Sequence, residues 1–268
     1  LRCRPPGGCV RDQVIVVTGG GSGIGRAAVL LAAGRGACVA VLDRDVAAAR
    51  SAVAEALARG SANAAAIACD VTSEAQVSEA FAAVQDRLGV PAGLFTAAGI
   101  DVGGSAHEMS AGTWQHVIAT NLTGTFLAAR TAIRAMVESG RGGSVVLCSS
   151  PAASVGLAAG AASAYSASKG GVSALARTLA VEYARSGIRV NAVVPGPTET
   201  PLMWANVSAA DVGSMRAVIC GEVPLGRLAA PEEPARAVLW LLSAESSYVT
   251  GSHLVCDGGI LAKACISV

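Results

Sequence analysis

The chain has 268 residues, of which 52% are hydrophobic, 3% aromatic and 15% charged, and its formal net charge is +1. That length suits one large α/β domain, and the scattered Lys and Arg residues form no basic stripe of the kind that neutralises a nucleic-acid backbone. The longest apolar helical run covers residues 27–33, far fewer than the roughly 20 residues that a membrane span needs. We therefore expect neither a nucleic-acid partner nor a membrane partner.

The eight cysteines are dispersed, with no C-x-x-C pair and no nearby histidine cluster, so we expect no metal site. Cys38, Cys69 and Cys148 lie inside apolar segments, where cysteine usually behaves as a small hydrophobic residue, and this favours a reducing, cytoplasmic location. Residues 1–11 are rich in Arg, Pro and Gly and lack the apolar stretch of a signal peptide. We expect a disordered tail there and a single domain over residues 12–268.

Short apolar runs alternate with longer segments of helical period along the chain. The expected strands are Val14–Thr18, Ala37–Asp43, Ala64–Asp70, Gly93–Ala97, Gly143–Ser149, Ile188–Val194 and His253–Asp257. The expected helices lie near residues 23–35, 45–59, 73–88, 113–138, 163–185 and 231–243. Alternation of this kind indicates an α/β fold with a doubly wound, Rossmann-type parallel sheet and helices on both faces.

One long segment, residues 195–227, shows no clear period. Loops of such length are uncommon in a compact fold and often cover a site. We expect this segment to be a substrate lid.

A glycine-rich turn joins the first expected strand to the first expected helix. Glycines allow a tight turn and a close approach of the backbone to a pyrophosphate, which then faces the free N–H groups at the start of the helix. The residues expected to bind a dinucleotide there are Gly19, Gly21, Ser22, Gly23, Ile24 and Gly25. A tight turn without any ligand is the alternative interpretation.

The second expected strand ends at Asp43, where a carboxylate can bind both ribose hydroxyls of NAD and repel the 2′-phosphate of NADP. Ser22 adds no positive charge to offset that repulsion, although Arg44 could turn toward a phosphate. Asp43 could instead be a solvated acid or a helix cap. The pattern favours NAD over NADP.

Further expected contacts lie where other strands end, at the carboxyl edge of the sheet. These are Asp70 and Val71 after the third strand, and Ala97, Ala98 and Gly99 after the fourth. Asp70 could accept a hydrogen bond from adenine, but Asp70 or Thr72 could equally cap the next helix.

Tyr165 and Lys169 are four residues apart near the start of an expected helix and so share one face. A free phenol has a pKa of about 10, so making it a base near neutral pH requires about 4 kcal/mol of preferential phenolate stabilisation. A nearby ammonium and the positive charge of an oxidised nicotinamide provide an effect of that kind. An isolated pair at this spacing is usually only a surface contact.

The order of the motifs is more specific than any one of them. The glycine-rich turn, Asp43, Asp70-Val71, Asn121, Ser149-Ser150, Tyr165 with Lys169, and Pro195-Gly196 together resemble the short-chain dehydrogenase/reductase family, over about residues 14–259. The resemblance implies a catalytic tetrad of Asn121, Ser150, Tyr165 and Lys169.

In the implied mechanism Tyr165 is the acid/base, Ser150 polarises the substrate oxygen, and Lys169 binds the nicotinamide ribose and lowers the pKa of Tyr165. Asn121 positions a relay water through its backbone. The resemblance also implies that Pro195, Gly196, Thr198 and Thr200 contact the nicotinamide, and that the chain forms a homotetramer or homodimer through helices 113–138 and 163–185. Without the resemblance, Asn121 could be only a kink residue and the serines only turn formers.

The sequence departs from the family pattern in three places. Thr96 stands where an Asn is usual, the lid sequence is idiosyncratic, and the interval from Ser150 to Tyr165 is slightly long, so that Ser149 or Ser154 could be the catalytic serine.

We expect the lid to line an apolar pocket for a hydrophobic secondary alcohol or ketone, although its apolar residues could instead be the core of short helices. The apolar candidates are Leu157, Leu202, Met203, Trp204, Val207, Met215, Val218 and Ile219, with Glu199, Glu222 and Arg216 as polar ones. His107 and His116 are interpreted as surface or helix residues.

Three rival functions remain at this point. One is an NADPH-dependent 3-ketoacyl thioester reductase, which Asp43 and Ser22 disfavour. Another is a non-catalytic dinucleotide-binding sensor or scaffold, since a fold does not fix a function. A methyltransferase would share the glycine-rich turn but has no use for the Tyr165 and Lys169 pair.

Overall fold

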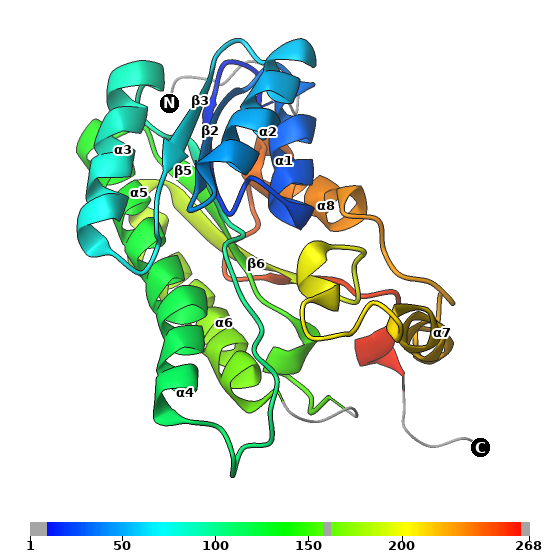
Figure 1. Ribbon diagram of the computed structural model, residues 1–268. Helices are drawn as coiled ribbons and strands as arrows, with labels where there is room; N and C mark the ends of the chain where they lie inside the picture. Colours follow the sequence, from blue (N-terminus) through cyan, green and yellow to red (C-terminus); the bar gives the residue numbers. More distant parts are fainter. Residues whose placement is uncertain (1–9, 158–161, 264–268) are drawn as a thin grey trace.

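Seven parallel strands form one sheet in the order β3-β2-β1-β4-β5-β6-β7 in the computed structural model, which describes residues 10–157 and 162–263 (Figure 1). The strands are β1 (Val14–Thr18), β2 (Cys38–Asp43), β3 (Ala64–Ala68), β4 (Gly93–Thr96), β5 (Gly143–Cys148), β6 (Ile188–Pro195) and β7 (His253–Cys256). Each expected strand is present, with small shifts at the ends, and the Rossmann-type fold is confirmed.

The helices alternate with the strands and cover both faces of the sheet (Figure 1). The α-helices are α1 (Gly23–Ala33), α2 (Val46–Ala58), α3 (Glu74–Leu88), α4 (Ala111–Ile118), α5 (Gly124–Ser139), α6 (Ser163–Tyr183), α7 (Val212–Glu222) and α8 (Glu232–Leu242). The short helical turns are η1 (Ala119–Thr123), η2 (Pro151–Ala153), η3 (Ala184–Ser186), η4 (Pro201–Trp204), η5 (Ala244–Ser246) and η6 (Ile260–Ala262).

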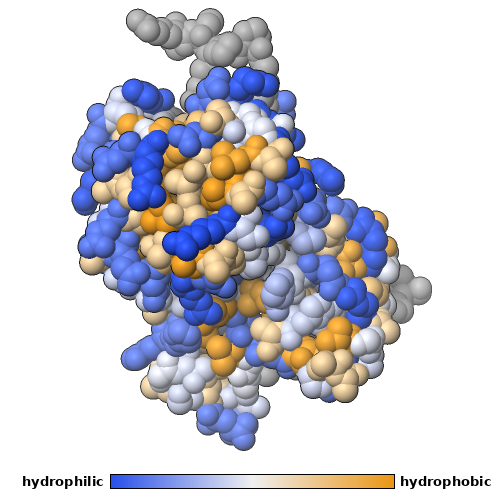
Figure 2. Space-filling model, turned by 45° about the horizontal axis from the view of Figure 1, so that its top comes forward, coloured by the Kyte–Doolittle hydropathy of each residue, from blue (hydrophilic) through white to orange (hydrophobic). Residues whose placement is uncertain are grey.

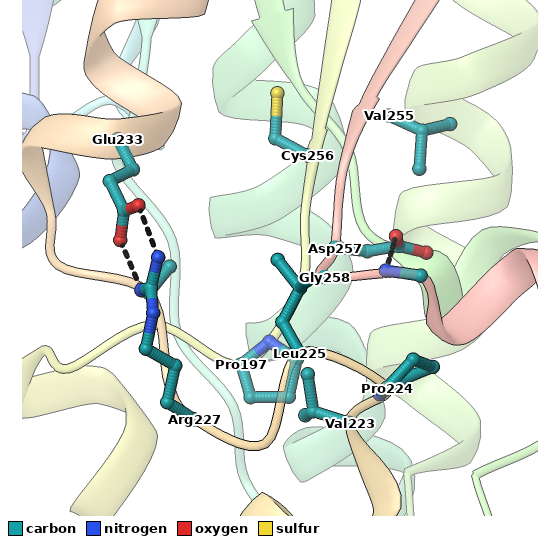
Figure 3. Close-up of a pocket in the computed structure, with 12 residues that line it drawn as sticks. Pro197, Val223, Pro224, Leu225, Arg227, Glu233, Val255, Cys256, Asp257 and Gly258 are labelled. Carbon is teal, nitrogen blue, oxygen red and sulfur yellow. Dashed lines mark hydrogen bonds and ion pairs between the residues drawn. The ribbon is translucent and has the colours of Figure 1, made fainter.

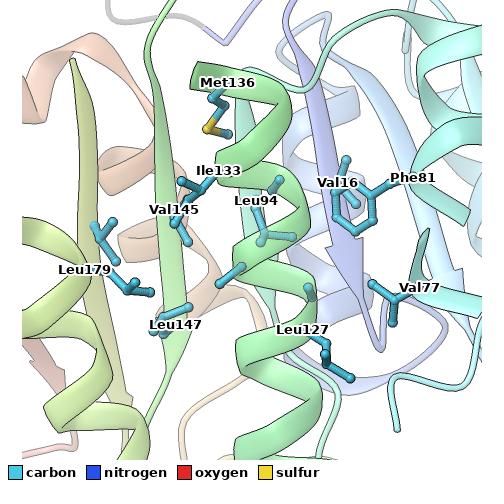
Figure 4. Close-up of a cluster of buried hydrophobic side chains, with 14 of the residues drawn as sticks. Val16, Val77, Phe81, Leu94, Leu127, Ile133, Met136, Val145, Leu147 and Leu179 are labelled. Carbon is cyan, nitrogen blue, oxygen red and sulfur yellow. The ribbon is translucent and has the colours of Figure 1, made fainter. Parts of the chain in front are cut away.

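Two buried cores lie on the two faces of the sheet. Helices α3, α5 and α6 pack on one face, where Leu127, Ile133 and Met136 of α5 lie against Leu94 and Val145 of the strands (Figure 4). Helices α1, α2 and α8 contribute to the other core. Alanine is abundant in both: for example, the buried residues of α2 are Ala49, Ala52 and Ala56. Small side chains bring the helices close to the sheet.

The expected continuous helix over residues 113–138 is wrong in one respect. The chain forms α4, then the π-helical turn η1, then α5. A π-turn holds one extra residue per turn, and here it contains Asn121, which is fully buried. Its side chain bonds to the loop after β4 rather than to solvent. The break is therefore tied to a specific tertiary contact.

The strand order places a topological switch point between β1 and β4. The chain leaves β1 toward β2 and β3 on one side, and leaves β4 toward β5, β6 and β7 on the other. Ligands of open α/β sheets bind beyond the carboxyl ends of the strands at such a point. The fold thus predicts a site next to Thr18 and Thr96, the last residues of these two strands.

The N-terminal stretch requires a correction. Residues 1–9 of the expected disordered tail lie outside the described residues, but Val10 is fully buried in the core beside α1 and β2. Its carbonyl accepts a hydrogen bond from Gln13 N at 3.1 Å. The ordered fold therefore begins no later than Val10, because this side chain completes an apolar core.

The surface in Figure 2 mixes hydrophilic areas with separate hydrophobic patches rather than one continuous hydrophobic band. Among the helices in the described ranges, none has the combined length and apolarity that a membrane crossing requires.

Candidate functional site

A cavity of about 1140 Å³ opens at the carboxyl ends of the strands. It exceeds the roughly 300–1000 Å³ of a typical small-molecule site, so it has room for two ligands. The expected site residues that line it are Gly19, Ser22, Gly23, Ile24, Gly25, Asp43, Arg44, Asp70, Val71, Ala97, Ala98, Gly99, Ser150, Tyr165, Lys169, Pro195, Gly196, Thr198 and Thr200. Gly21 and Asn121 are not on its wall. We call the part formed by the β1–α1 turn and the ends of β2, β3 and β4 the glycine end.

The turn after β1 is held against the end of β4. Gly19 has φ +66°, and a Cβ atom there would lie 2.6 Å from the backbone of Ala98. A Cβ atom on Gly25 would lie 2.2 Å from the carbonyl oxygen of Gly19. Only glycine allows these approaches, which leave the first amides of α1 facing the cavity. Ser22 is the N-cap residue of this helix, but its side chain makes no capping hydrogen bond.

Asp43 at the end of β2 is joined to the same turn. Its Oδ2 accepts a hydrogen bond from Gly21 N at 2.9 Å, and its Oδ1 accepts one from Asp45 N at 3.0 Å. Asp45, rather than Asp43, caps α2 through the N–H groups of Ala47 and Ala48. The capping alternative for Asp43 is therefore wrong, and its carboxylate faces the cavity with lone pairs to spare.

Asp70 has a local structural role in addition to its place on the wall. Its Oδ1 accepts hydrogen bonds from Thr72 N at 2.9 Å and from Thr72 Oγ1 at 2.7 Å, and these bonds hold the pKa of Asp70 below its usual value. Neither Asp70 nor Thr72 caps α3, because Ser73 does so. Arg44 is exposed on the wall nearby, and its charge also lowers the pKa of Asp70.

Tyr165, Lys169 and Ser150 meet at the middle of the cavity. Lys169 Nζ lies 5.6 Å from the centre of the Tyr165 ring and donates a hydrogen bond to the Cys148 carbonyl at 2.8 Å. Ser150, at the end of β5, hydrogen-bonds to the Tyr165 side chain and thereby lowers its pKa. The face shared by Tyr165 and Lys169 on α6 thus points toward the sheet edge.

The pKa of Tyr165 moves in the opposite direction to the expectation. Burial raises it strongly, the Cys148 thiol and Asp101 add to the rise, and only the hydrogen bond with Ser150 opposes them. Burial also lowers the pKa of Lys169, while Cys148 and Asp101 partly restore it. These side chains alone therefore do not make the phenol a base near neutral pH, because desolvation outweighs the hydrogen bond with Ser150.

The two other candidate serines are placed differently from Ser150. Ser149 is buried, and its Oγ pairs with Ser173 Oγ at 2.7 Å and with the Lys169 carbonyl at 3.2 Å, which fixes β5 to α6. Ser154 is exposed and does not line the cavity. Of the three, Ser150 is the serine that contacts Tyr165.

The side chain of Asn121 holds the loop after β4 by hydrogen bonds to Ile100, and we call this pair of bonds the clamp. Its Oδ1 accepts from Ile100 N at 2.8 Å, and its Nδ2 donates to Ile100 O at 2.8 Å and to Ser168 Oγ at 3.1 Å. Its carbonyl accepts a hydrogen bond from Thr125 Oγ1 at 2.7 Å. Thr96, the last residue of β4, is 2% exposed, and its hydroxyl group has no hydrogen-bond partner among the described residues. This fits a threonine that stands where an Asn, with its larger amide group, is usual.

The comparisons with known proteins agree with this arrangement. A family model described as "Enoyl-(Acyl carrier protein) reductase" matches residues 19–261. A short-chain type dehydrogenase/reductase from Mycobacterium marinum, solved by crystallography, superposes with a TM-score of 0.90 at 34% identity, over 95% of this chain and 98% of that one. The chain belongs to the short-chain dehydrogenase/reductase family.

Two curated relatives are dehydrogenases of alcohols. The chain is 37% identical to 2-(S)-hydroxypropyl-CoM dehydrogenase 3 of Xanthobacter autotrophicus, over 94% of this chain and 98% of the relative. It is 42% identical to cis-4-hydroxycyclohexanecarboxylate dehydrogenase of Sinomonas cyclohexanicum, over 94% and 97% respectively. The protein is thus an oxidoreductase of a family that acts on CH–OH and C=O groups with a nicotinamide dinucleotide. The glycine end suits that cofactor, because amide donors and a carboxylate face the same space.

The segment after β6 bends over the cavity of this short-chain dehydrogenase/reductase. Thr198 is 4% exposed and bridges to Ala229, while the Thr200 side chain accepts a hydrogen bond from Met203 N and caps η4. Thr200 also contacts the glycine turn, since a Cβ atom on Gly23 would lie 3.2 Å from its Cγ2. Both threonines therefore stand at the junction of the lid with the glycine end.

The residues of the segment 195–227, the expected lid, divide into those on the wall and those that are not. The apolar ones on the wall are Leu202, Met203, Met215 and Ile219, joined by Leu157 of the shorter loop, and we call this part of the cavity the lid end. Trp204, Val207 and Val218 are not on the wall. Glu199 and Arg216 are not on the wall either. They form an ion pair with each other, and the guanidinium group of Arg216 lies 5.1 Å from the centre of the Trp204 ring. Glu222 does line the cavity.

Several wall residues were missed by the sequence analysis. At the lid end they include Ile100, Asp101, Val155, Ile260, Leu261 and Lys263. Asp101 lies two residues after Gly99, where the fourth-strand motif ends, and this position was the signal in the sequence that could have placed it on the wall. His116 also borders the cavity while remaining an exposed residue of α4.

A second, shallower pocket of about 500 Å³ lies at the base of the lid beside β7 (Figure 3). Arg227 and Glu233 form an ion pair on one side of it, with a shortest distance of 2.7 Å. On the other side Asp257 accepts hydrogen bonds from Gly259 N and Leu261 N. These contacts tie the lid base to α8 and the C-terminal turn to the end of β7.

Proposed function

We propose that this protein transfers hydride between NAD(H) and an apolar secondary alcohol or ketone, with Tyr165 as its acid/base. The observation that carries the proposal is the meeting of Tyr165, Lys169 and Ser150 in the cavity that also contains the glycine turn and Asp43. A single domain over residues 12–268 with a lid over 195–227 completes the proposed organisation.

The glycine end is proposed to hold the dinucleotide. The first amides of α1 would bind the pyrophosphate, because they are free and lie at the positive end of the helix dipole. Asp43 would bind the ribose hydroxyls, and it supports NAD because a 2′-phosphate would meet its negative charge. The proposed contacts are Gly19, Gly21, Ser22, Gly23, Ile24, Gly25, Asp43, Arg44, Asp70, Val71, Ala97, Ala98, Gly99, Tyr165, Lys169, Pro195, Gly196, Thr198 and Thr200.

The proposed chemistry uses three side chains around the carbinol. Bound oxidised cofactor supplies the hydride acceptor and a positive charge. In alcohol oxidation Tyr165 accepts the hydroxyl proton, and in ketone reduction it returns a proton to the same oxygen. Ser150 donates a hydrogen bond to the substrate oxygen in both directions. Lys169 holds the ribose and favours the phenolate, which offsets the burial that raises the pKa of Tyr165.

Asn121 completes the proposed tetrad as a positioning residue. Its clamp on Ile100 fixes the wall beside Lys169, and its backbone would hold a relay water. The carbonyl of Asn121, which accepts a hydrogen bond from Thr125 Oγ1 at 2.7 Å, is the group proposed to hold this water.

The substrate is proposed to be a secondary alcohol because the lid end is mostly apolar and the curated relatives are named for secondary alcohols. The nonpolar wall formed by Leu157, Leu202 and Met215 would exclude water from the reacting carbon.

We further propose a cytoplasmic homotetramer. Trp114, Phe126 and Val181 on α4, α5 and α6 are 40%, 40% and 82% exposed, and Val255 and Leu225 beside β7 are 45% and 67% exposed. A dimer needs one such surface, whereas a tetramer with dihedral symmetry needs at least two. Cys69, Cys148 and Cys256 are free thiols, as a reducing compartment requires.

The deciding experiment is a comparison of wild-type protein with Tyr165→Phe on a panel of secondary alcohols and ketones. We expect kcat to fall by about 10²–10⁴-fold, because a positioned acid/base contributes that much, while the Kd for NAD changes little. Tyr183→Phe, at the far end of α6, is the matched control and should retain wild-type kcat.

Each rival function predicts a different result. A protein that binds NAD, turns over nothing and is indifferent to Tyr165→Phe would be a sensor or scaffold. Turnover of 3-ketoacyl thioesters with NADPH in preference to NADH would support the thioester reductase instead. Either result contradicts the proposal.

A further inference from the structure

A carboxylate at the lid end has no established partner. Asp101 follows Ile100 on the loop after β4 and lines the cavity between Lys169 and the lid. Its Oδ1 is shielded from solvent and accepts no hydrogen bond from the described residues. Because Oδ1 is closed off, we infer that a ligand in the cavity would reach this carboxyl group through Oδ2. A half-buried carboxylate without donors is costly, so a ligand that donates to it gains affinity.

The backbone around Asp101 is held by hydrogen bonds from two sides. Asn121 holds both the N–H and the carbonyl of Ile100 at 2.8 Å. Asn206 of the lid donates from Nδ2 to the Asp101 carbonyl at 3.1 Å. The side chain of Asp101 is therefore presented at a set position, which is what a recognition group requires.

The charges near Asp101 favour a neutral donor over a charged one. Burial raises the pKa of its carboxyl, and the nearby Lys169 ammonium offsets part of that rise. A substrate ammonium would meet the charge of Lys169, and a substrate carboxylate would meet that of Asp101. The two arginines of the lid, Arg216 and Arg227, are already paired with Glu199 and Glu233. Lys263 is at the rim, where it donates to the Glu222 carbonyl at 3.3 Å.

We propose that Asp101 selects the substrate by accepting a hydrogen bond from a second hydroxyl group, so that the preferred substrates are apolar diols or hydroxyketones. This inference rests on the proposed alcohol dehydrogenase activity. Asp101 takes no part in proton or hydride transfer; it orients the ring or chain that carries the reacting carbinol.

The test uses one carbon skeleton with different second groups. The probes are cyclohexanol, the 1,2-, 1,3- and 1,4-cyclohexanediols, and 4-hydroxycyclohexanecarboxylate, each assayed with NAD. We expect at least one diol to exceed cyclohexanol in kcat/KM by about 10-fold or more, because a site built for a hydroxyl rejects an analogue that lacks it. The carboxylate should be the poorest probe.

Variants then separate recognition from a general electrostatic effect. Asp101→Leu should lower kcat/KM for the preferred diol to the level of cyclohexanol, chiefly through KM, while activity on cyclohexanol stays within about threefold. Asp101→Asn should retain part of the preference, since an amide still accepts a hydrogen bond. Glu222→Gln, which changes the other carboxylate of the lid end, should keep the wild-type ratio of diol to cyclohexanol.

A second readout does not depend on turnover. In the Tyr165→Phe background with NAD bound, calorimetry should show tighter binding of the preferred diol than of cyclohexanol, and Asp101→Leu should abolish the difference.

The outcomes distinguish this inference from the function on which it rests. Turnover of alcohols with no diol preference, or an equal loss on all probes in Asp101→Leu, overturns the role of Asp101 alone. No turnover of any secondary alcohol or ketone by the wild-type protein overturns the proposed function itself.

Discussion

The glycine end of the cavity rests on a helix with many buried residues, whereas the lid end rests on helices with none. Helix α1, which begins at the glycine turn, has seven buried residues from Gly25 to Ala33, whereas α7 and η4 of the lid have none. The first region is held by the core of the fold, and the second only by a few contacts such as the ion pair of Glu199 with Arg216. We infer that the glycine end is rigid and general, while the lid end can change its substrate without disturbing the fold.

The largest expected effect comes from adding one methyl group to a glycine in each region and comparing the two variants. In Gly25→Ala the new Cβ atom would lie 2.2 Å from Gly19 O, so the turn must shift. We expect the free energy of unfolding to fall by about 1–3 kcal/mol and the Kd for NAD to rise by at least about 10-fold. Denaturant titration and calorimetry measure both quantities.

The matched change at the lid is Gly213→Ala in α7, where no atom lies within 4 Å of the added Cβ. It should leave NAD binding unchanged and stabilise the helix by at most about 1 kcal/mol. Equal damage from the two substitutions would contradict the division between a rigid region and a tolerant one.

Cofactor choice tests whether the glycine end also depends on individual side chains. Asp43→Ser removes the charge that would repel a 2′-phosphate and leaves exposed Arg44 nearby. The ratio of kcat/KM for NAD to that for NADP should fall by at least about 10-fold. Asp45→Asn is the control, because it keeps a capping residue at the start of α2 but removes the charge of Asp45. The ratio of kcat/KM for NAD to that for NADP should stay at the wild-type value in this variant. An unchanged ratio in Asp43→Ser would remove the basis for the NAD assignment.

The contact between the lid and the loop after β4 can be weakened alone. Asn206→Ala removes the 3.1 Å hydrogen bond to the Asp101 carbonyl, a loss of about 1 kcal/mol. The KM for the alcohol should rise about fivefold, with the Kd for NAD unaffected. Ser208→Ala, which loses only a bond to Asp211 within the lid, is the control. A matching rise in the Kd for NAD would show that the two ends are coupled.

The smallest effect concerns pH. Asp101 raises the pKa of both Tyr165 and Lys169, alongside Cys148, while Ser150 lowers that of Tyr165. In Asp101→Asn both pKa values should fall, because a negative charge that favours the protonated forms is gone. Alcohol oxidation requires the phenolate and the ammonium, so both limbs of the profile of kcat against pH should move to lower pH.

Glu222→Gln removes a carboxylate that does not affect the pKa of Tyr165, so its pH profile should match that of the wild type. A shift to higher pH in Asp101→Asn would contradict the assigned electrostatics.

The same division explains what the sequence could predict. The strands, the turn after β1 and the placement of Asp43 follow from apolar periodicity and from glycines that no other residue can replace, and the structure reproduces them. A kink at Asn121 was only an alternative interpretation of the sequence, and the hydrogen bonds behind it were not predicted, because they join this residue to Ile100, 21 positions away in the chain. Asp101 was missed for a similar reason: its environment is set by Lys169 and the lid.

The lowering of the Tyr165 pKa that we expected includes the charge of an oxidised nicotinamide, whereas burial by the protein raises this pKa. The spacing to Lys169 gives the sign of one interaction, but it does not give the cost of burying the phenol. Only a three-dimensional structure shows which of the two is larger.

The alanine-rich cores have a consequence for how this protein tolerates mutation. Only two phenylalanines, Phe81 and Phe95, are among its large fully buried side chains, and helices such as α2 rest on the sheet through methyl groups. Replacing such an alanine by glycine removes little apolar area, so the severe truncations are those of the larger buried side chains such as Leu94 and Ile188. Enlarging Ala49 or Ala52, in contrast, would force a whole helix away from the strands. At these alanine positions the vulnerable direction for random substitution is therefore growth of the side chain, and tolerance should be narrowest where the helices lie closest to the strands.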